Sequence, residues 1–132
     1  MTCKILFFDL EDCERYFFED CQFNNFDIKF FQCRLDERTI NRLEPEDFQE
    51  RMMICVNDKS KITSDIISKF KNLRLISTRG ANYKHIDLPA CADNNIAVIN
   101  VEDDNETCED ILKKAFAGMT SYLCGGKDFR IL

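Results

Sequence analysis

Short apolar runs alternate with amphipathic stretches along the chain. Each run has the length of a strand, and several are almost continuously apolar, which is typical of parallel strands covered on both faces. The pattern predicts strands at 4–10, 26–33, 52–56, 73–77 and 96–99. The polar stretch 35–49 predicts an irregular connection with room for one short helix.

Helical spacing of apolar residues separates and follows these runs. Helices are expected at 11–21, from 63 or 64 to about 70, from 88 to about 94, and at 106–124. In the first of these, Cys13, Tyr16 and Phe17 should face inward. Asp87 is expected to cap the helix that follows it, and Thr63 or Ser64 to cap the helix that runs to about residue 70.

This alternation of strands and helices predicts an α/β fold with right-handed crossovers and a doubly wound parallel sheet. A length of 132 residues fits a single domain. We divide it into a core at 1–101, a C-terminal helix at 106–124, and a tail at 127–132 that could add a strand.

Composition excludes some classes of protein. The net charge of -6 and a pI near 4.8 argue against a general nucleic-acid binder. The apolar run 5–8 is too short for a signal sequence or a membrane span. We therefore expect a cytoplasmic protein with no membrane or nucleic-acid partner.

The eight cysteines have no metal-binding spacing, because there is no CxxC pair and no Cys/His cluster. Cys13, Cys91, Cys108 and Cys124 fall on or near apolar helical stripes. We expect buried free thiols in a reducing compartment, and no metal.

The stretch NLRLISTRGANYKHIDLPACADNNIAVINV at 72–101 resembles the substrate domain of the D-isomer-specific 2-hydroxyacid dehydrogenases. The resemblance extends over 4–110, weakly between 33 and 53. It implies a flavodoxin-like sheet of five parallel strands in the order 2-1-3-4-5, plus the C-terminal helix. The matching residues in 72–101 are Asn72, Leu73, Leu75, Ile76, Thr78, Arg79, Tyr83, His85, Ile86, Asp87, Leu88, Ala90, Cys91, Ile96, Ala97, Val98, Asn100 and Val101.

In the resembled family, the loop after the fourth strand holds a substrate carboxylate through backbone amides. That role falls here on Ala81 and Asn82, although the family usually has Gly in place of Asn82. The alternative is a tight strand–helix connection without a ligand. Arg79 could meet an anion or form an intramolecular ion pair. The ligand-binding candidates are Asn57, Thr78, Arg79, Gly80, Ala81, Asn82 and Tyr83.

The family's catalytic Arg, Glu and His lie in a second, NAD-binding domain that we expect this chain to lack. The GxGxxG fingerprint is absent from the sequence, so we expect no NAD binding and no catalytic residue. The only histidine, His85, matches a structural loop position. Glu102, Asp103 and Asp104 place carboxylates near the expected anion site, and we take them as candidates for an interaction surface.

The last helix carries a wide apolar stripe that includes Phe116, Met119 and Tyr122. In the resembled family, the corresponding segment lies at the domain junction and contributes to dimer contacts. The helix could fold back onto its own sheet or form a homodimer, and we favour the homodimer.

Three functions remain open. The first is a non-catalytic relative of the substrate domain that acts as a protein-binding regulatory or inhibitory module. The second is a sensor of a small carboxylate at Ala81 and Asn82. The third is the substrate-domain half of a split NAD-dependent dehydrogenase.

Overall fold

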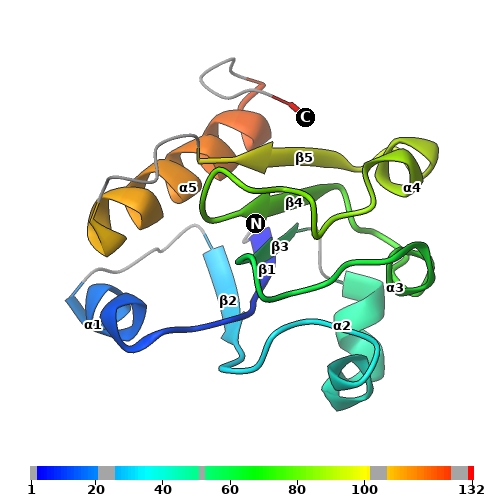
Figure 1. The fold of residues 1–132 in the computed structure, drawn as a ribbon, viewed down its shortest axis with the longest axis horizontal. Helices are drawn as coiled ribbons and strands as arrows, with labels where there is room; N and C mark the ends of the chain where they lie inside the picture. Colours follow the sequence, from blue (N-terminus) through cyan, green and yellow to red (C-terminus); the bar gives the residue numbers. More distant parts are fainter. Residues whose placement is uncertain (1–2, 21–25, 51–52, 102–106, 126–130) are drawn as a thin grey trace.

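The computed structural model describes residues 3–20, 26–50, 53–101, 107–125 and 131–132. Five parallel strands form one sheet in the order β2-β1-β3-β4-β5, as predicted (Figure 1). The strands are β1 (Cys3–Phe7), β2 (Phe26–Phe30), β3 (Met53–Val56), β4 (Leu75–Thr78) and β5 (Ala97–Asn100).

Burial follows the position of each strand in the sheet. The central strands β3 and β4 are buried at every residue, which explains why their sequences are so uniformly apolar. The edge strand β2 is less buried, with Asp27 and Phe30 exposed and the other three residues half-buried.

The helices lie close to their expected positions. They are α1 (Asp12–Asp20), the 3-10 helix η1 (Thr39–Arg42), α2 (Pro45–Glu50), α3 (Ser64–Ser68), α4 (Leu88–Asp93) and α5 (Cys108–Leu123). Asp87 caps α4 as predicted, and Thr63, one of the two candidates, caps α3, because each side chain accepts a hydrogen bond from the backbone N–H three residues later. The expected irregular segment holds η1 and α2 rather than one helix.

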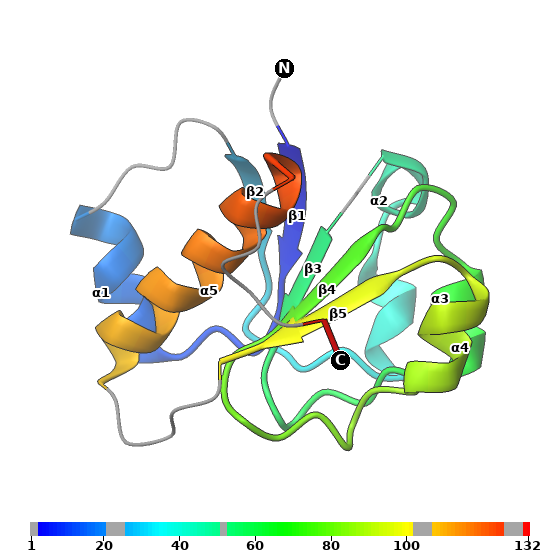
Figure 2. The same ribbon diagram turned by 90° about the horizontal axis from the view of Figure 1, so that it is seen from above.

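The helices cover the sheet on two faces, which Figure 2 shows edge-on. Helices α2, α3 and α4 cover one face, hereafter the α2–α4 face. Its core includes Leu6, Ile54, Ile66, Ile76 and Val98. Helices α1 and α5 cover the other face, hereafter the α1/α5 face. Its core includes Ile5, Phe7, Cys55, Phe116 and Met119.

Helix α5 folds back onto its own sheet. Phe116 is 4% exposed and Met119 is fully buried, while half-buried Tyr122 packs against the same core. Of the two arrangements open for this stripe, the structure shows the intramolecular one. Phe116 and Met119 are therefore core residues in this structure, not the surface residues that an interaction site needs.

Two expectations about side chains in α1 are wrong. Tyr16 is 68% exposed and Cys13 is also exposed, whereas Glu14 is 4% exposed and faces inward with Phe17. Glu14 and Phe17 are three residues apart and share one side of the helix. The carboxylate can be buried because a guanidinium meets it, as described below.

The tail does pair with the sheet at its described end. Ile131 forms an isolated antiparallel bridge with Ile99, and the Leu132 N–H donates to the Val98 carbonyl at 2.8 Å. In the part of the chain that the structure describes, no helix has the length and apolarity needed to cross a membrane.

Candidate functional site

The loops that leave the carboxyl ends of β1, β3 and β4 surround a pocket of about 410 Å³. Ligands of parallel α/β sheets bind at this edge. The N-terminal turns of α1 and α5 complete the wall. The lining residues are Glu11, Cys13, Glu14, Asn57, Asp58, Arg79, Gly80, Ala81, Asn82, Cys108 and Ile111.

Asp9 links two of the loops at this edge of the sheet. It is buried and adopts a left-handed backbone conformation with φ 60° just after β1. One carboxylate oxygen accepts hydrogen bonds from the Asn57 N–H at 3.0 Å and from the Ser60 hydroxyl at 2.6 Å. The loop after β3 is thereby tied to the loop after β1, and Asn57 is held at the pocket.

Arg79 is committed to an internal ion pair. Its guanidinium is buried and pairs through Nε and Nη2 with Glu14, the Nη2–Oε1 distance being 3.1 Å. Nη2 also donates to the carbonyls of Phe8 and Asp9 at 2.9 and 3.0 Å. The guanidinium carbon lies 4.1 Å from the centre of the Phe7 ring. Of the two roles open for Arg79, the structure shows the intramolecular pair.

Burial raises the pKa of Glu14 above its ordinary value, and the adjacent Arg79 opposes that rise. Burial likewise raises the pKa of the Cys55 thiol, to which Arg79 Nη1 donates at 3.5 Å. Arg79 thus neutralises charge inside the protein and is not a free cation for a ligand.

The turn after β4 is shaped by Gly80. Its φ of +120° is strained for residues with a side chain, so glycine is required here. Asn82, where the family usually has Gly, does not adopt a left-handed backbone conformation, and its side chain accepts a hydrogen bond from the Lys84 N–H at 3.0 Å. Asn100 ties the turn to β5 by donating to the Ala81 carbonyl at 3.0 Å.

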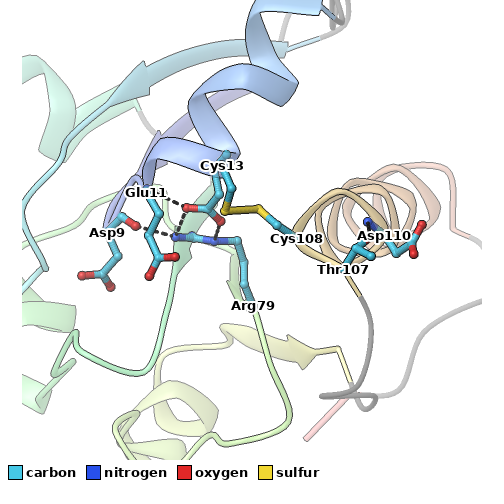
Figure 3. The surroundings of a disulfide bond; sticks show 8 residues. Asp9, Glu11, Cys13, Arg79, Thr107, Cys108 and Asp110 are labelled. Carbon is cyan, nitrogen blue, oxygen red and sulfur yellow. Dashed lines mark hydrogen bonds and ion pairs between the residues drawn. A yellow bond between two sulfur atoms is a disulfide. The ribbon is translucent and has the colours of Figure 1, made fainter.

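A disulfide joins α1 to α5 across the pocket wall. Cys13 and Cys108 lie in the first turns of these helices, with their Cα atoms 6.4 Å apart (Figure 3). The expectation of free thiols is therefore wrong for this pair, which is 95 residues apart in sequence. Cys91 is a buried free thiol as expected, and its burial raises the pKa of the thiol to about 11. Cys124 is free but exposed, so the expectation of burial is wrong for it.

Five of the seven predicted ligand-binding residues line the pocket. They are Asn57, Arg79, Gly80, Ala81 and Asn82. Thr78 is fully buried, with its hydroxyl 3.0 Å from Nε2 of His85, and Tyr83 is 39% exposed outside the lining. The interaction candidates Glu102, Asp103 and Asp104 lie outside the described residues.

The contribution of the helices to this pocket was not predicted from the sequence. Cys13 and Glu14 come from the first turn of α1, which Glu11 immediately precedes, and Cys108 and Ile111 come from the start of α5. The helical spacing of Glu14 and Phe17 was a usable signal, because a carboxylate on an apolar side needs a partner. No local signal pointed to α5.

A parallel sheet with a pocket at its carboxyl edge is the arrangement of ligand-binding α/β domains. The sequence matches the family described as D-isomer specific 2-hydroxyacid dehydrogenase, catalytic domain, over residues 5–110. The chain belongs to this family, which confirms the resemblance. A comparison with curated proteins gives no match.

Several solved structures share the fold. D-lactate dehydrogenase from Escherichia coli is 16% identical, with a TM-score of 0.64 over 89% of this chain and 36% of that chain. The pyruvate reductase of Chlamydomonas reinhardtii is 18% identical, with a TM-score of 0.65 over 94% of this chain and 36% of that chain. The Aquifex aeolicus D-lactate dehydrogenase complexed with NAD and lactic acid is 21% identical, with a TM-score of 0.59 over 89% of this chain and 33% of that chain. This chain thus spans about a third of their length, and the likeness shows the fold.

Proposed function

We propose that this domain works by binding a protein partner, as a regulatory module without catalytic activity of its own, and that its pocket receives a basic side chain of that partner. The observation that carries the proposal is the charge of the pocket. Three carboxylates line it, from Glu11, Glu14 and Asp58, against one guanidinium. That guanidinium, of Arg79, is already paired with Glu14.

The two remaining carboxylates are accessible. Glu11 and Asp58 are both exposed, and they enter the pocket from different loops. A Lys or Arg side chain between them would gain charge-assisted hydrogen bonds without displacing an internal pair. The overall charge of -6 would also speed the approach of a basic partner at low salt.

A small-carboxylate sensor is the second candidate. The Gly80 turn favours it, because it lies where the resembled family binds a substrate carboxylate. The same carboxylates that favour a cation oppose this ligand, since like charges repel in a partly desolvated pocket. The domain could also serve as the substrate half of a split dehydrogenase, and the test below includes that outcome.

Calorimetry at low ionic strength with three matched hexapeptides tests the proposal. The peptides carry Lys and Arg, Gln, or Glu at the same positions. We expect saturable binding of the basic peptide, weakened about 2- to 5-fold for each neutralised carboxylate in Glu11→Gln and Asp58→Asn. The matched control is Glu46→Gln/Asp93→Asn, which removes two exposed charges on α2 and α4, away from the pocket.

Equal weakening by the control would show that only overall charge matters and would overturn the proposal. Binding of lactate or pyruvate in place of the basic peptide would favour the sensor. Turnover of a 2-hydroxy acid with NAD, after addition of a separate nucleotide-binding domain from a relative, would favour the split enzyme.

A further inference from the structure

We propose that Cys13–Cys108 is a redox-active disulfide that undergoes exchange with thiols arriving through the pocket, at the Cys13 sulfur, and that it selects neutral or cationic thiols over anionic ones. This inference does not depend on what else the pocket binds. It adds a site of covalent chemistry to a domain whose other pocket residues only offer charges and hydrogen bonds.

Access is the first reason. Both cysteines line the 410 Å³ pocket, so the bond faces a space that a small thiol can enter. Cys13 is exposed while Cys108 is half-buried, which makes the Cys13 sulfur the accessible one. By contrast, the free thiols of Cys3, Cys55 and Cys91 are buried.

The second reason is the position of the leaving group. Attack at Cys13 expels the thiolate of Cys108, which is the first residue of a 16-residue helix. Thr107 caps this helix by accepting a hydrogen bond from the Asp110 N–H at 3.2 Å. The positive end of the helix stabilises a thiolate there, and a stabilised thiolate leaves faster. Exposed Glu109 and Asp110 offset part of this effect.

Apart from the two cysteines, the exchange needs no group of the protein, because two molecules of the thiol RSH supply its electrons and protons. A thiolate RS⁻ attacks the Cys13 sulfur, forming Cys13–S–S–R and releasing Cys108 as a thiolate. A second thiolate then attacks the R sulfur, giving RSSR and the Cys13 thiolate. Both protein thiolates take up the protons that the two RSH molecules released, and two electrons pass from the reagent to the protein.

The fold does not need to open for this reaction. Helix α5 is held on the sheet by Leu112, Phe116 and Met119, which are buried about one to three turns beyond Cys108, so we expect this packing to persist when the disulfide is reduced. Figure 3 shows the disulfide as the covalent link between the first turns of α1 and α5, and opening the bond would release that link. The bond can therefore be cut and re-formed in the folded state.

The charge of the pocket gives the selectivity. Glu11, Asp58 and the Glu14–Arg79 pair line the approach to the disulfide, so its net charge is negative. An anionic thiol pays a repulsive energy on entering, whereas an amino-thiol does not. Salt should erase the difference, because these carboxylates act through partly solvated space.

The test measures the reduction rate of the folded protein, in a Cys124→Ser background that removes the one exposed free thiol among the described residues. Cysteamine, 2-mercaptoethanol and 2-mercaptoethanesulfonate are compared at equal thiolate concentration, since the thiolate is the nucleophile. Samples are quenched with a maleimide and mapped by peptide mass spectrometry. We expect cysteamine to react at least about threefold faster than the sulfonate at low salt, with convergence at 0.5 M salt.

The first mixed disulfide should be found on Cys13, with Cys108 carrying the maleimide. Glu11→Gln/Asp58→Asn should narrow the spread between reagents, and Glu46→Gln/Asp93→Asn should not. The proposal is overturned if reduction is no faster than global unfolding, if the first adduct lies on Cys108, or if the three thiols react equally at low salt. It is also overturned if the protein purified in air shows no link between Cys13 and Cys108.

Discussion

The two faces of the sheet are held together in different ways. On the α2–α4 face, mainly apolar side chains pack under helices that lie near their strands in sequence, as with Ile66 and Ile67 of α3 between β3 and β4. An ion pair there, between α2 and β2, joins Asp47 to a half-buried Lys29. On the α1/α5 face, specific pairs join distant segments. Arg79 meets Glu14 across 65 residues, and Cys13 is bonded to Cys108 across 95.

This difference predicts which substitutions should destabilise the folded protein most. Apolar burial is non-directional, so the α2–α4 face should tolerate exchange among side chains of similar volume. A buried ion pair and a disulfide depend on both partners, so loss of one partner leaves an uncompensated charge or a free thiol. The pocket lies beside this second, more specific kind of contact.

The strongest test is to break the buried pair. Glu14→Gln leaves the Arg79 guanidinium buried without a counter-charge and should lower the free energy of unfolding by about 3–5 kcal/mol. Glu109→Gln breaks an exposed pair with Lys113 and should cost less than about 1 kcal/mol. Urea unfolding measures both. Equal losses of unfolding free energy in the two variants would show that the buried Glu14–Arg79 pair stabilises the protein no more than an exposed ion pair does.

Truncating a buried ring of α5 should destabilise the protein nearly as much. Phe116→Ala removes a ring that is stacked against Phe7 and should cost about 3–5 kcal/mol. Because this ring lies in the chain's own core, sedimentation should show the same oligomeric state before and after the change. Leu123→Ala, at a 41% exposed position, is the control. A dimer that dissociates on Phe116→Ala would support the homodimer expected from the sequence.

Removing the disulfide should have an intermediate effect. The Cys13→Ser/Cys108→Ser variant should lose about 2–4 kcal/mol of unfolding free energy, because the unfolded chain regains the freedom of a long loop. Cys124→Ser should change little, since that thiol is free and exposed. Identical curves for the wild type and the double variant would contradict this prediction.

A helix cap on the other face tests a purely local interaction. Asp87 accepts a hydrogen bond from the Ala90 N–H at 3.0 Å, so Asp87→Ala should cost about 1 kcal/mol. Asp93→Ala, at the far end of α4, should cost nothing, because a carboxylate there opposes the helix dipole. Thermal unfolding compares the two. A larger loss in Asp93→Ala would show that the cap is not what stabilises α4.

The smallest effect should come from His85. Burial lowers the pKa of its imidazole below the ordinary value of 6.5, with Asp58 opposing the shift. The unfolded chain therefore binds this proton more readily, and stability should fall as pH drops below about 6.5. Since His85 is the only histidine, an NMR titration follows it directly, and His85→Gln should remove this part of the pH dependence. A folded-state pKa above 6.5 would reverse the sign.

The candidate site was predictable where neighbours in sequence form it. The Thr78–Tyr83 loop could be located because a strand precedes it and Gly80 marks a turn, and most of its candidates do line the pocket. The role of Arg79 could not be derived, since its partner Glu14 lies on another element. The partner of a buried charge is the group that lies next to it in the folded protein, and the separation of two residues in sequence does not reveal that group.

What the sequence determined by itself is the order of strands and helices along the chain, the cap at Asp87, and the family. These follow from local periodicity, turn chemistry and an ordered set of matching residues. The tertiary structure alone decided that α5 covers its own sheet, that Cys13 and Cys108 are joined, and that the charge of Arg79 is internal. The reason is physical: an apolar stripe, a thiol and a guanidinium each accept several partners, and only packing in three dimensions selects one.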